Sequence, residues 1–131
     1  MTIDKLGLIY IKDKKLLSVR SKNKDAYYVP GGKRKNNETD IQALAREIKE
    51  EISVDIIPES LKFINKFEAQ AHGKEQDITV IITAYFGEFI GEIEPDSEIE
   101  EIKWLSYEDI KNATPTMKLI LNYLKERDLI S

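Results

Sequence analysis

The 131-residue chain is predicted to fold as one α+β sandwich that covers residues 1–131 as a single domain. Three observations support this prediction. The length suits one hydrophobic core. The hydrophobic fraction of 41% and the charged fraction of 34% are those of a globular protein. Along the chain, the apolar patterns follow the order strand, strand, loop, helix, several strands and helix, without a repeat or a linker.

The expected strands are apolar runs bounded by turn-forming residues. Leu6 to Ile11 and Lys15 to Val19 are separated by a polar turn and therefore predict a β-hairpin. A brief strand at Tyr27 to Val29 is expected to end at the following proline and glycines. The later strands are expected at Leu61 to Phe67, Ile78 to Phe89 and Glu98 to Leu105. The long run from Ile78 to Phe89 is expected to be central.

The expected helices are marked by apolar residues at intervals of three and four. Such a stripe runs from Ile41 to Ile52, and either Thr39 or Asp40 can cap its N-terminus. The residues of the stripe are Ile41, Leu44, Ala45, Ile48 and Ile52. A short helix is expected at residues 107–110, and a C-terminal helix at residues 116–129 should close the domain.

Composition excludes several classes of function. There is no cysteine, so disulfides, thiolate ligands and cysteine nucleophiles are excluded, and a metal must bind oxygen or the single His72. His72 lies in a polar loop and is expected to be exposed rather than functional. The net charge of −4 argues against bulk nucleic-acid binding. No run of about 18 apolar residues could cross a membrane, and no targeting segment is seen, so we expect a cytoplasmic protein.

Three glutamates of the first helix are the strongest candidates for chemistry. On a helical wheel, Glu47, Glu50 and Glu51 fall within an arc of about 100°, beside the apolar stripe. Like charges so close together repel one another unless a cation compensates, and hard oxygen ligands suit magnesium, with manganese as an alternative. The competing interpretation of these residues alone is a solvated acidic face.

The surrounding residues decide between these interpretations. The string from Gly32 to Val54 resembles the Nudix box, in which a glycine, glutamates and an Arg-Glu pair recur at fixed spacing. The matching positions are Gly32, Glu38, Arg46, Glu47, Ile48, Glu50, Glu51 and Val54. Ser53 departs from the pattern, because the family has glycine there. At a helix C-terminus that glycine commonly adopts a left-handed conformation, so Ser53 is expected to cost stability rather than activity.

The resemblance implies a Nudix-type α/β/α sandwich, with a mixed β-sheet between helices, and Mg²⁺-dependent hydrolysis of a diphosphate linkage. It also implies that Glu47, Glu50 and Glu51 bind the metal with the Gly32 carbonyl, and that Glu98, on a later strand, supplies a further ligand. Arg46 would pair with Glu38 to fix the loop against the helix. Which of Glu47, Glu50, Glu51 and Glu98 takes the proton from the attacking water stays open.

The substrate expectation rests on the same resemblance. Residues 28–32, Tyr-Val-Pro-Gly-Gly, look like the loop that precedes the box in MutT-like enzymes, and Arg20, Tyr28 and Lys33 are the candidate substrate-binding residues. Arg34 is a weaker candidate near the phosphates. The expected reaction converts a nucleoside triphosphate to the monophosphate and pyrophosphate. ADP-ribose, a nucleotide sugar, a dinucleoside polyphosphate or a capped RNA end stay open as substrates, as does a non-catalytic nucleotide-sensing module, and the protein could act as a monomer or a homodimer.

Overall fold

The computed structural model describes residues 1–71 and 77–131. Its α-helices are α1 (Asp40–Ile52) and α2 (Pro115–Glu126), and its 3₁₀ helices are η1 (Pro58–Ser60) and η2 (Tyr107–Asn112). The strands are β1 (Thr2–Ile9), β2 (Ile11–Lys12), β3 (Lys15–Ser21), β4 (Gly31–Gly32), β5 (Asp55–Ile56), β6 (Lys62–Gln70), β7 (Thr79–Phe86), β8 (Phe89–Ile90) and β9 (Ile99–Leu105).

The main sheet is mixed and has the strand order β4-β1-β7-β6. Strand β1 runs parallel to β7 and antiparallel to β4, and β7 runs antiparallel to β6. The segment that was expected to be central therefore lies inside the sheet as β7. A second, antiparallel sheet has the order β2-β3-β9, and β5 pairs with β8. The prediction of a mixed sheet in an α+β sandwich is confirmed.

The expected N-terminal hairpin is only partly correct. Its polar turn exists, but it joins the two-residue strand β2 to β3. The apolar run before it belongs mainly to β1, which pairs with β4 and β7 instead. Alternation of apolar residues identifies a strand but does not name its partner, which explains the error. Likewise, the strand expected at Tyr27 to Val29 is a single bridge between Val19 and Tyr28.

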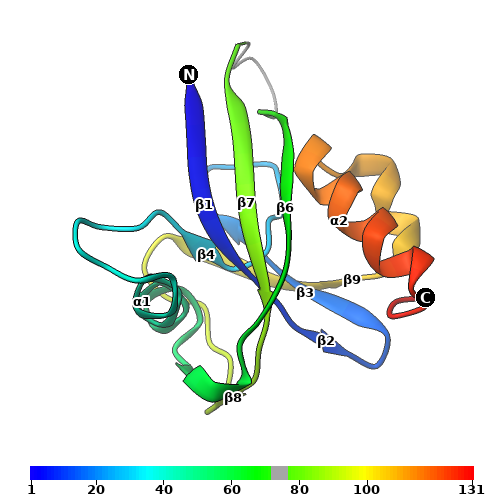
Figure 1. The fold of residues 1–131 in the computed structure, drawn as a ribbon. Helices are drawn as coiled ribbons and strands as arrows, with labels where there is room; N and C mark the ends of the chain where they lie inside the picture. Colours follow the sequence, from blue (N-terminus) through cyan, green and yellow to red (C-terminus); the bar gives the residue numbers. More distant parts are fainter. Residues whose placement is uncertain (72–76) are drawn as a thin grey trace.

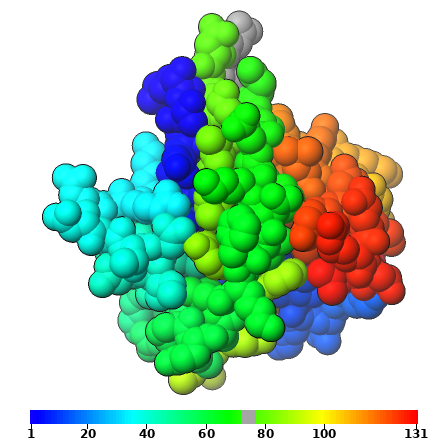
Figure 2. All heavy atoms as spheres, in the orientation of Figure 1, coloured from blue at the N-terminus to red at the C-terminus, as the bar shows by residue number. Residues whose placement is uncertain are grey.

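The helices lie on opposite sides of the main sheet (Figure 1). α1 packs against β1, β4 and β5, and its buried residues join a core cluster with Leu6, Leu8 and Leu17. α2 packs against β6 and β7, where its apolar face joins a second cluster that includes Phe67 and Ile82. Figure 2 shows β6 on the surface between the α1 side and the α2 side of the molecule. This arrangement is an α/β/α sandwich.

The ends of α1 follow from its sequence. Thr39 caps the N-terminus: its hydroxyl accepts the Gln42 N–H, and the Gln42 side chain accepts the Thr39 N–H, which is a capping box. The helix ends at Ser53, whose left-handed conformation (φ 65°, ψ 21°) is the one expected for that position. The buried stripe differs at two positions, because Ile41 is 43% exposed and Ala45 is only half-buried, whereas Ala43 is buried.

No helix in the described part of the chain is long and apolar enough to span a membrane.

Candidate active site

Strand β4 and helix α1 bring two glycines against two of the predicted glutamates. The Gly31 N–H donates to Glu51 Oε1 at 2.8 Å. A side-chain carbon at Gly32 would lie 2.5 Å from the carboxyl carbon of Glu47, and one at Gly31 would collide with the Leu6 carbonyl. Only glycine therefore allows the helix carboxylates to lie this close to the β4 backbone.

Arg46 fixes the loop between β4 and α1. Its guanidinium makes a two-pronged ion pair with Glu38, with Nε to Oε2 at 2.7 Å and Nη2 to Oε1 at 2.9 Å. The same side chain donates to Glu47 Oε1 at 2.8 Å and to the Lys33 carbonyl at 3.1 Å. The hydrogen bonds from Arg46 and from the Lys35 N–H lower the pKa of Glu38 to about 2. The structure thus contains the expected pair, in a structural position.

Glu51 occupies the least solvated position of the three helix glutamates. Burial raises its pKa to about 7, although the Gly31 N–H favours the charged carboxylate. The neighbouring negative charges of Glu47 and Glu50 raise it further. Glu51 therefore holds a proton more readily than an ordinary carboxyl group, which is typical of acid groups at functional sites.

The three predicted glutamates of α1 differ in their surroundings, and their role as metal ligands stays a prediction. Within residues 1–71 and 77–131, no three acidic or histidine side chains are grouped so that they could hold a metal ion. Glu50 has a 47% exposed side chain and lies 3.5 Å from the Arg46 Nη1, whereas Glu47 is held by the same guanidinium. The Arg46 guanidinium therefore compensates part of the negative charge that a metal cation was expected to compensate. The donor set of carboxylates beside the β4 backbone still fits a hard divalent ion, because every donor is oxygen.

A small cavity lies beside Glu51. Its volume is about 80 Å³, and Glu51, Gly31 and Tyr28 contribute to its wall. The other lining residues are Lys5, Leu6, Val19, Ser21, Val29 and Ile82. The Lys5 ammonium group lies 5.2 Å from the centre of the Tyr28 ring, a cation–π arrangement. The cavity thus joins one predicted glutamate, one predicted substrate-binding residue and a cation.

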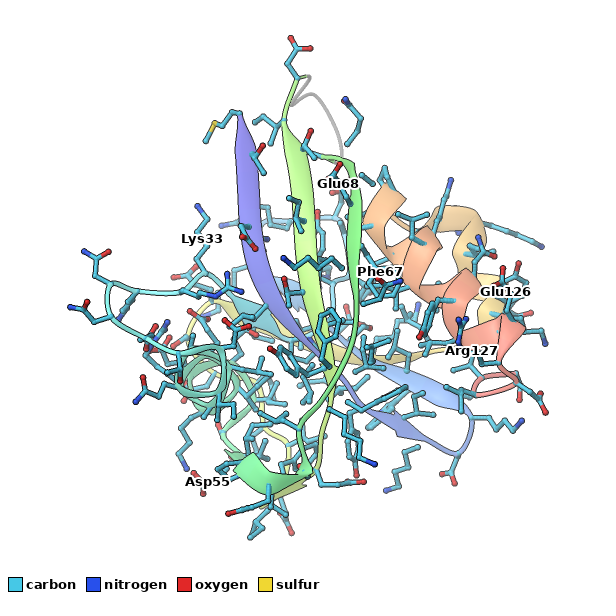
Figure 3. All side chains as sticks on the ribbon, in the orientation of Figure 1. Lys33, Asp55, Phe67, Glu68, Glu126 and Arg127 are labelled. Atoms are coloured by element: carbon cyan, nitrogen blue, oxygen red, sulfur yellow. The ribbon has the colours of Figure 1, made fainter. Side chains whose placement is uncertain are left out.

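The other predicted site residues lie elsewhere. Arg20 pairs with Glu101 at 3.1 Å and donates to the Lys24 carbonyl, and it does not line the cavity. Lys33 is exposed at the start of the loop, near β1 (Figure 3). Glu98 lies in the turn before β9 rather than on the strand, and its carbonyl accepts the Lys22 N–H. His72 is outside the described residues.

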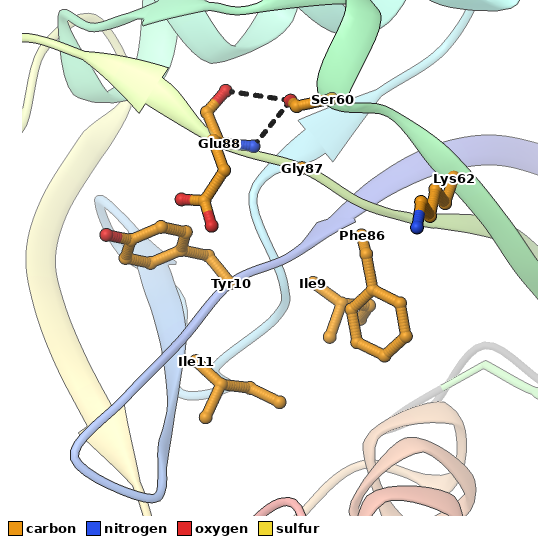
Figure 4. Close-up of a pocket in the computed structure, with 8 residues that line it drawn as sticks. All are labelled: Ile9, Tyr10, Ile11, Ser60, Lys62, Phe86, Gly87 and Glu88. Atoms are coloured by element: carbon orange, nitrogen blue, oxygen red, sulfur yellow. Dashed lines mark hydrogen bonds between the residues drawn. The ribbon is translucent and has the colours of Figure 1, made fainter.

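A larger cavity of about 380 Å³ lies at the ends of β1 and β7 (Figure 4). Ile9 and Phe86 form its apolar part, and Lys62 and Glu88 contribute charges. Ser60 accepts the Glu88 N–H at 2.7 Å on its wall. None of the helix glutamates lines this cavity, so its size does not make it the candidate site.

Sequence reasoning missed two features of this region. Lys5 directly precedes the apolar run of β1 that begins at Leu6, and this charge was the available signal for a residue that lines the cavity. The second feature is an ion-pair network in which Arg34 donates to Asp40 Oδ1 at 2.6 Å, and the Tyr85 hydroxyl donates to Asp40 Oδ2 at 2.7 Å. Arg34 and Tyr85 are 51 positions apart, so no local pattern could reveal this network.

Comparisons with known proteins show the family of the chain. The family model of the NUDIX domain matches residues 4–124, so the chain belongs to the Nudix family, and we identify it as a Nudix pyrophosphohydrolase. Comparison with curated protein sequences gave no match.

Solved structures show the same fold. The E. coli ORF135 protein is 21% identical, with a TM-score of 0.72 over 95% of this chain and 91% of that one. A NUDIX hydrolase from Nitrosomonas europaea is 19% identical, with a TM-score of 0.73 and coverages of 96% and 90%. The MutT protein from Methanosarcina mazei Go1 is 17% identical, with a TM-score of 0.74 and coverages of 97% and 95%.

Proposed function

We propose that this chain hydrolyses a nucleoside triphosphate with Mg²⁺ and releases the nucleoside monophosphate and pyrophosphate. The observation that carries the proposal is the placement of Glu47 and Glu51 on the glycine backbone of β4, beside a cavity. In this proposal a metal-bound diphosphate would approach the protein here. A cytoplasmic location and action as a monomer or homodimer belong to the same proposal.

The metal would be held by Glu47, Glu50, Glu51 and the Gly32 carbonyl, with Glu98 as a further candidate. When bound, Mg²⁺ neutralises diphosphate charge and acidifies water, and Mn²⁺ could replace it. The protein supplies the positions of these oxygens. Glu47 is oriented by Arg46, which is in turn held by Glu38. Arg46 and Glu38 therefore act through the carboxylates and need not touch the substrate.

We assign the proton transfer from the attacking water to Glu51. It is the helix glutamate that lines the cavity, and its Oε1 is oriented by the Gly31 N–H. Its Oε2 is the atom that would take the proton. Glu47 is engaged by a guanidinium, and Glu50 is directed to solvent near the same group, so neither is placed as well.

The walls of the cavity support a nucleotide as the substrate. The Lys5 ammonium group, which lies over the Tyr28 ring, would offer a positive charge to a phosphate oxygen. MutT-like proteins among the solved structures of the same fold agree with this choice. Lys33 is solvent-exposed beside the loop and could reach a phosphate from outside, whereas Arg20 would have to leave Glu101 first.

A panel of nucleotides tests this proposal. The purified protein is incubated with Mg²⁺ and nucleoside triphosphates, ADP-ribose, nucleotide sugars, dinucleoside polyphosphates or capped RNA, and the products are identified by mass. We expect a nucleoside triphosphate to be the best substrate, with monophosphate and pyrophosphate as products. If another member of the panel has a higher kcat/KM, that compound becomes the proposed substrate in place of the nucleoside triphosphate. Binding without turnover of any member would indicate a sensing module.

A further inference from the structure

A second arginine, besides Arg46, holds the loop between β4 and α1. Arg34 Nε donates to Asp40 Oδ1 at 2.6 Å, and its Nη1 lies 3.4 Å from Asp4 Oδ1. Asp40 is the first residue of α1, and Asp4 belongs to β1. Arg34, near the start of the loop, therefore links this part of the chain to Asp40 at the end of the loop and to Asp4 in the main sheet.

The same contacts continue to β7. The Tyr85 hydroxyl donates to Asp40 Oδ2 at 2.7 Å, so both oxygens of that carboxylate are occupied. The Tyr85 ring is itself packed edge-on against Phe63 of β6, with ring centres 5.8 Å apart. These contacts tie β1, the loop, α1 and β7 together. The Arg34 guanidinium, helped by the Tyr85 hydroxyl, lowers the pKa of Asp40 against the opposing effect of burial, so the carboxylate stays charged at neutral pH.

The position of Arg34 in the chain connects this network to the site. Gly32 lies two residues before Arg34, and its carbonyl is a candidate metal ligand. In the sheet, Gly32 pairs with Leu6 of β1. The residue between Gly32 and Arg34 is Lys33, whose carbonyl accepts a hydrogen bond from Arg46 Nη2. The backbone at Gly32 is thus fixed by the sheet on one side, and on the other side by a loop that two arginines hold.

We propose that Arg34 is a positioning residue, which acts through Asp40, Asp4 and Tyr85 to hold the Gly32 backbone and the α1 glutamates in register for metal binding. This inference rests on the proposed function and deepens it. It replaces the expectation that Arg34 contacts the substrate phosphates. The Nε and Nη1 atoms already face carboxylates, and Asp40 and Asp4 compensate the positive charge. Partners that orient ligands contribute to metal affinity without touching the metal.

The test measures Mn²⁺ binding to the free protein from the electron paramagnetic resonance signal of unbound Mn²⁺. The variants are Arg34→Ala, Asp40→Asn and the double variant. If Arg34 acts through Asp40, each single change weakens Mn²⁺ binding about 10-fold, the lower end of the effect of removing an orienting partner. The double variant is then no weaker than either single one, because both changes remove the same contact.

Milder variants and a control complete the experiment. Arg34→Lys keeps the charge and is expected to restore part of the Mn²⁺ affinity. Tyr85→Phe removes one hydrogen bond but keeps the ring beside Phe63, and a loss of about 3-fold is expected, smaller than that of Arg34→Ala. These two variants carry the test if Arg34→Ala does not fold. Arg127→Ala, which removes a surface guanidinium beside Tyr123 at the end of α2, is the matched control and should bind Mn²⁺ like the wild type.

Two outcomes overturn the inference. Unchanged Mn²⁺ affinity in Arg34→Ala with a raised KM would make Arg34 a substrate-binding residue, and Asp40→Asn would then leave KM unchanged or lower it. Additive losses in the double variant would mean that Arg34 and Asp40 act separately. Failure of the proposed function is a different result, because a wild-type protein that binds Mn²⁺ without turning over any nucleotide still allows the binding comparison.

Discussion

Helices α1 and α2 cover opposite faces of the same sheet, but they differ beside their buried stripes. Both begin at a threonine cap, Thr39 in α1 and Thr114 in α2, and both bury an apolar face. At the edge of the α1 stripe lie the half-buried charges of Arg46, Glu47 and Glu51. An apolar stripe therefore explains how each helix packs, and the charged residues at the edge of the α1 stripe are those to which the proposed function assigns the chemistry.

The strand beneath each helix accounts for the difference. Under α1, the glycines of β4 leave space and an N–H group for the carboxylates of Glu47 and Glu51. Under α2, β6 presents Phe67, whose ring packs edge-on against Tyr123 at 5.4 Å. Large side chains fill that layer. Changes in α1 should therefore affect turnover, and changes in the buried face of α2 should affect the free energy of unfolding.

The largest effect is expected for Glu51→Gln. Removing the proposed proton acceptor should lower kcat about 10³-fold, which corresponds to about 4 kcal/mol, while the circular dichroism spectrum of the folded protein is retained. Glu126→Gln, at an exposed position near the end of α2, is the matched control and should keep the wild-type rate. If Glu51→Gln retains Mg²⁺-dependent turnover of the best substrate, the proposal that α1 carries the chemistry and α2 only stabilises the fold is contradicted.

The next effect belongs to α2. Leu121 is fully buried, and Leu121→Ala should lower the free energy of unfolding by about 3 kcal/mol through lost apolar contacts and a cavity. Urea denaturation measures this loss, and kcat per folded molecule should remain near the wild-type value. A large fall in kcat, with stability unchanged, would show that α2 takes part in the chemistry.

A pH-dependent effect should follow from the buried Glu51. Its pKa is raised from 4.5 to about 7, so the unfolded chain ionises first as the pH rises. The free energy of unfolding of the metal-free protein should fall by about 2 kcal/mol between pH 4.5 and pH 7 and then level off. Urea denaturation in a chelator measures this slope. It should be reduced in Glu51→Gln and unchanged in Glu126→Gln; the same slope in all three proteins would exclude Glu51 as its source.

The smallest effect is expected at the end of α1. Ser53 has a left-handed backbone with φ 65°, which costs a non-glycine residue about 1 kcal/mol. Ser53→Gly should therefore raise the melting temperature with little change in kcat. The Ser53 hydroxyl donates to the Glu94 carbonyl at 3.2 Å, and losing this bond offsets part of the gain. A lower melting temperature would mean that this hydrogen bond outweighs the strain.

The sequence by itself determined the elements and the family. Periods of two and of three to four residues located the principal strands and both α-helices, because side-chain direction repeats with those periods. The resemblance of residues 32–54 to the Nudix box implied the Arg46–Glu38 pair, which lies within one loop and the first half of one helix. Local patterns were sufficient for these features because the partners are close in the chain.

Only the tertiary structure decided which strands pair and which charges meet. Strand β1 pairs with β7, which is far away in the chain. Arg34 contacts Asp4 and Asp40, and the Tyr85 hydroxyl donates to Asp40. No sequence pattern links these residues. The raised pKa of Glu51 has the same origin, since burial depends on everything packed around the carboxyl group. Such effects arise from neighbours in space, and a pattern of neighbours in sequence does not contain them.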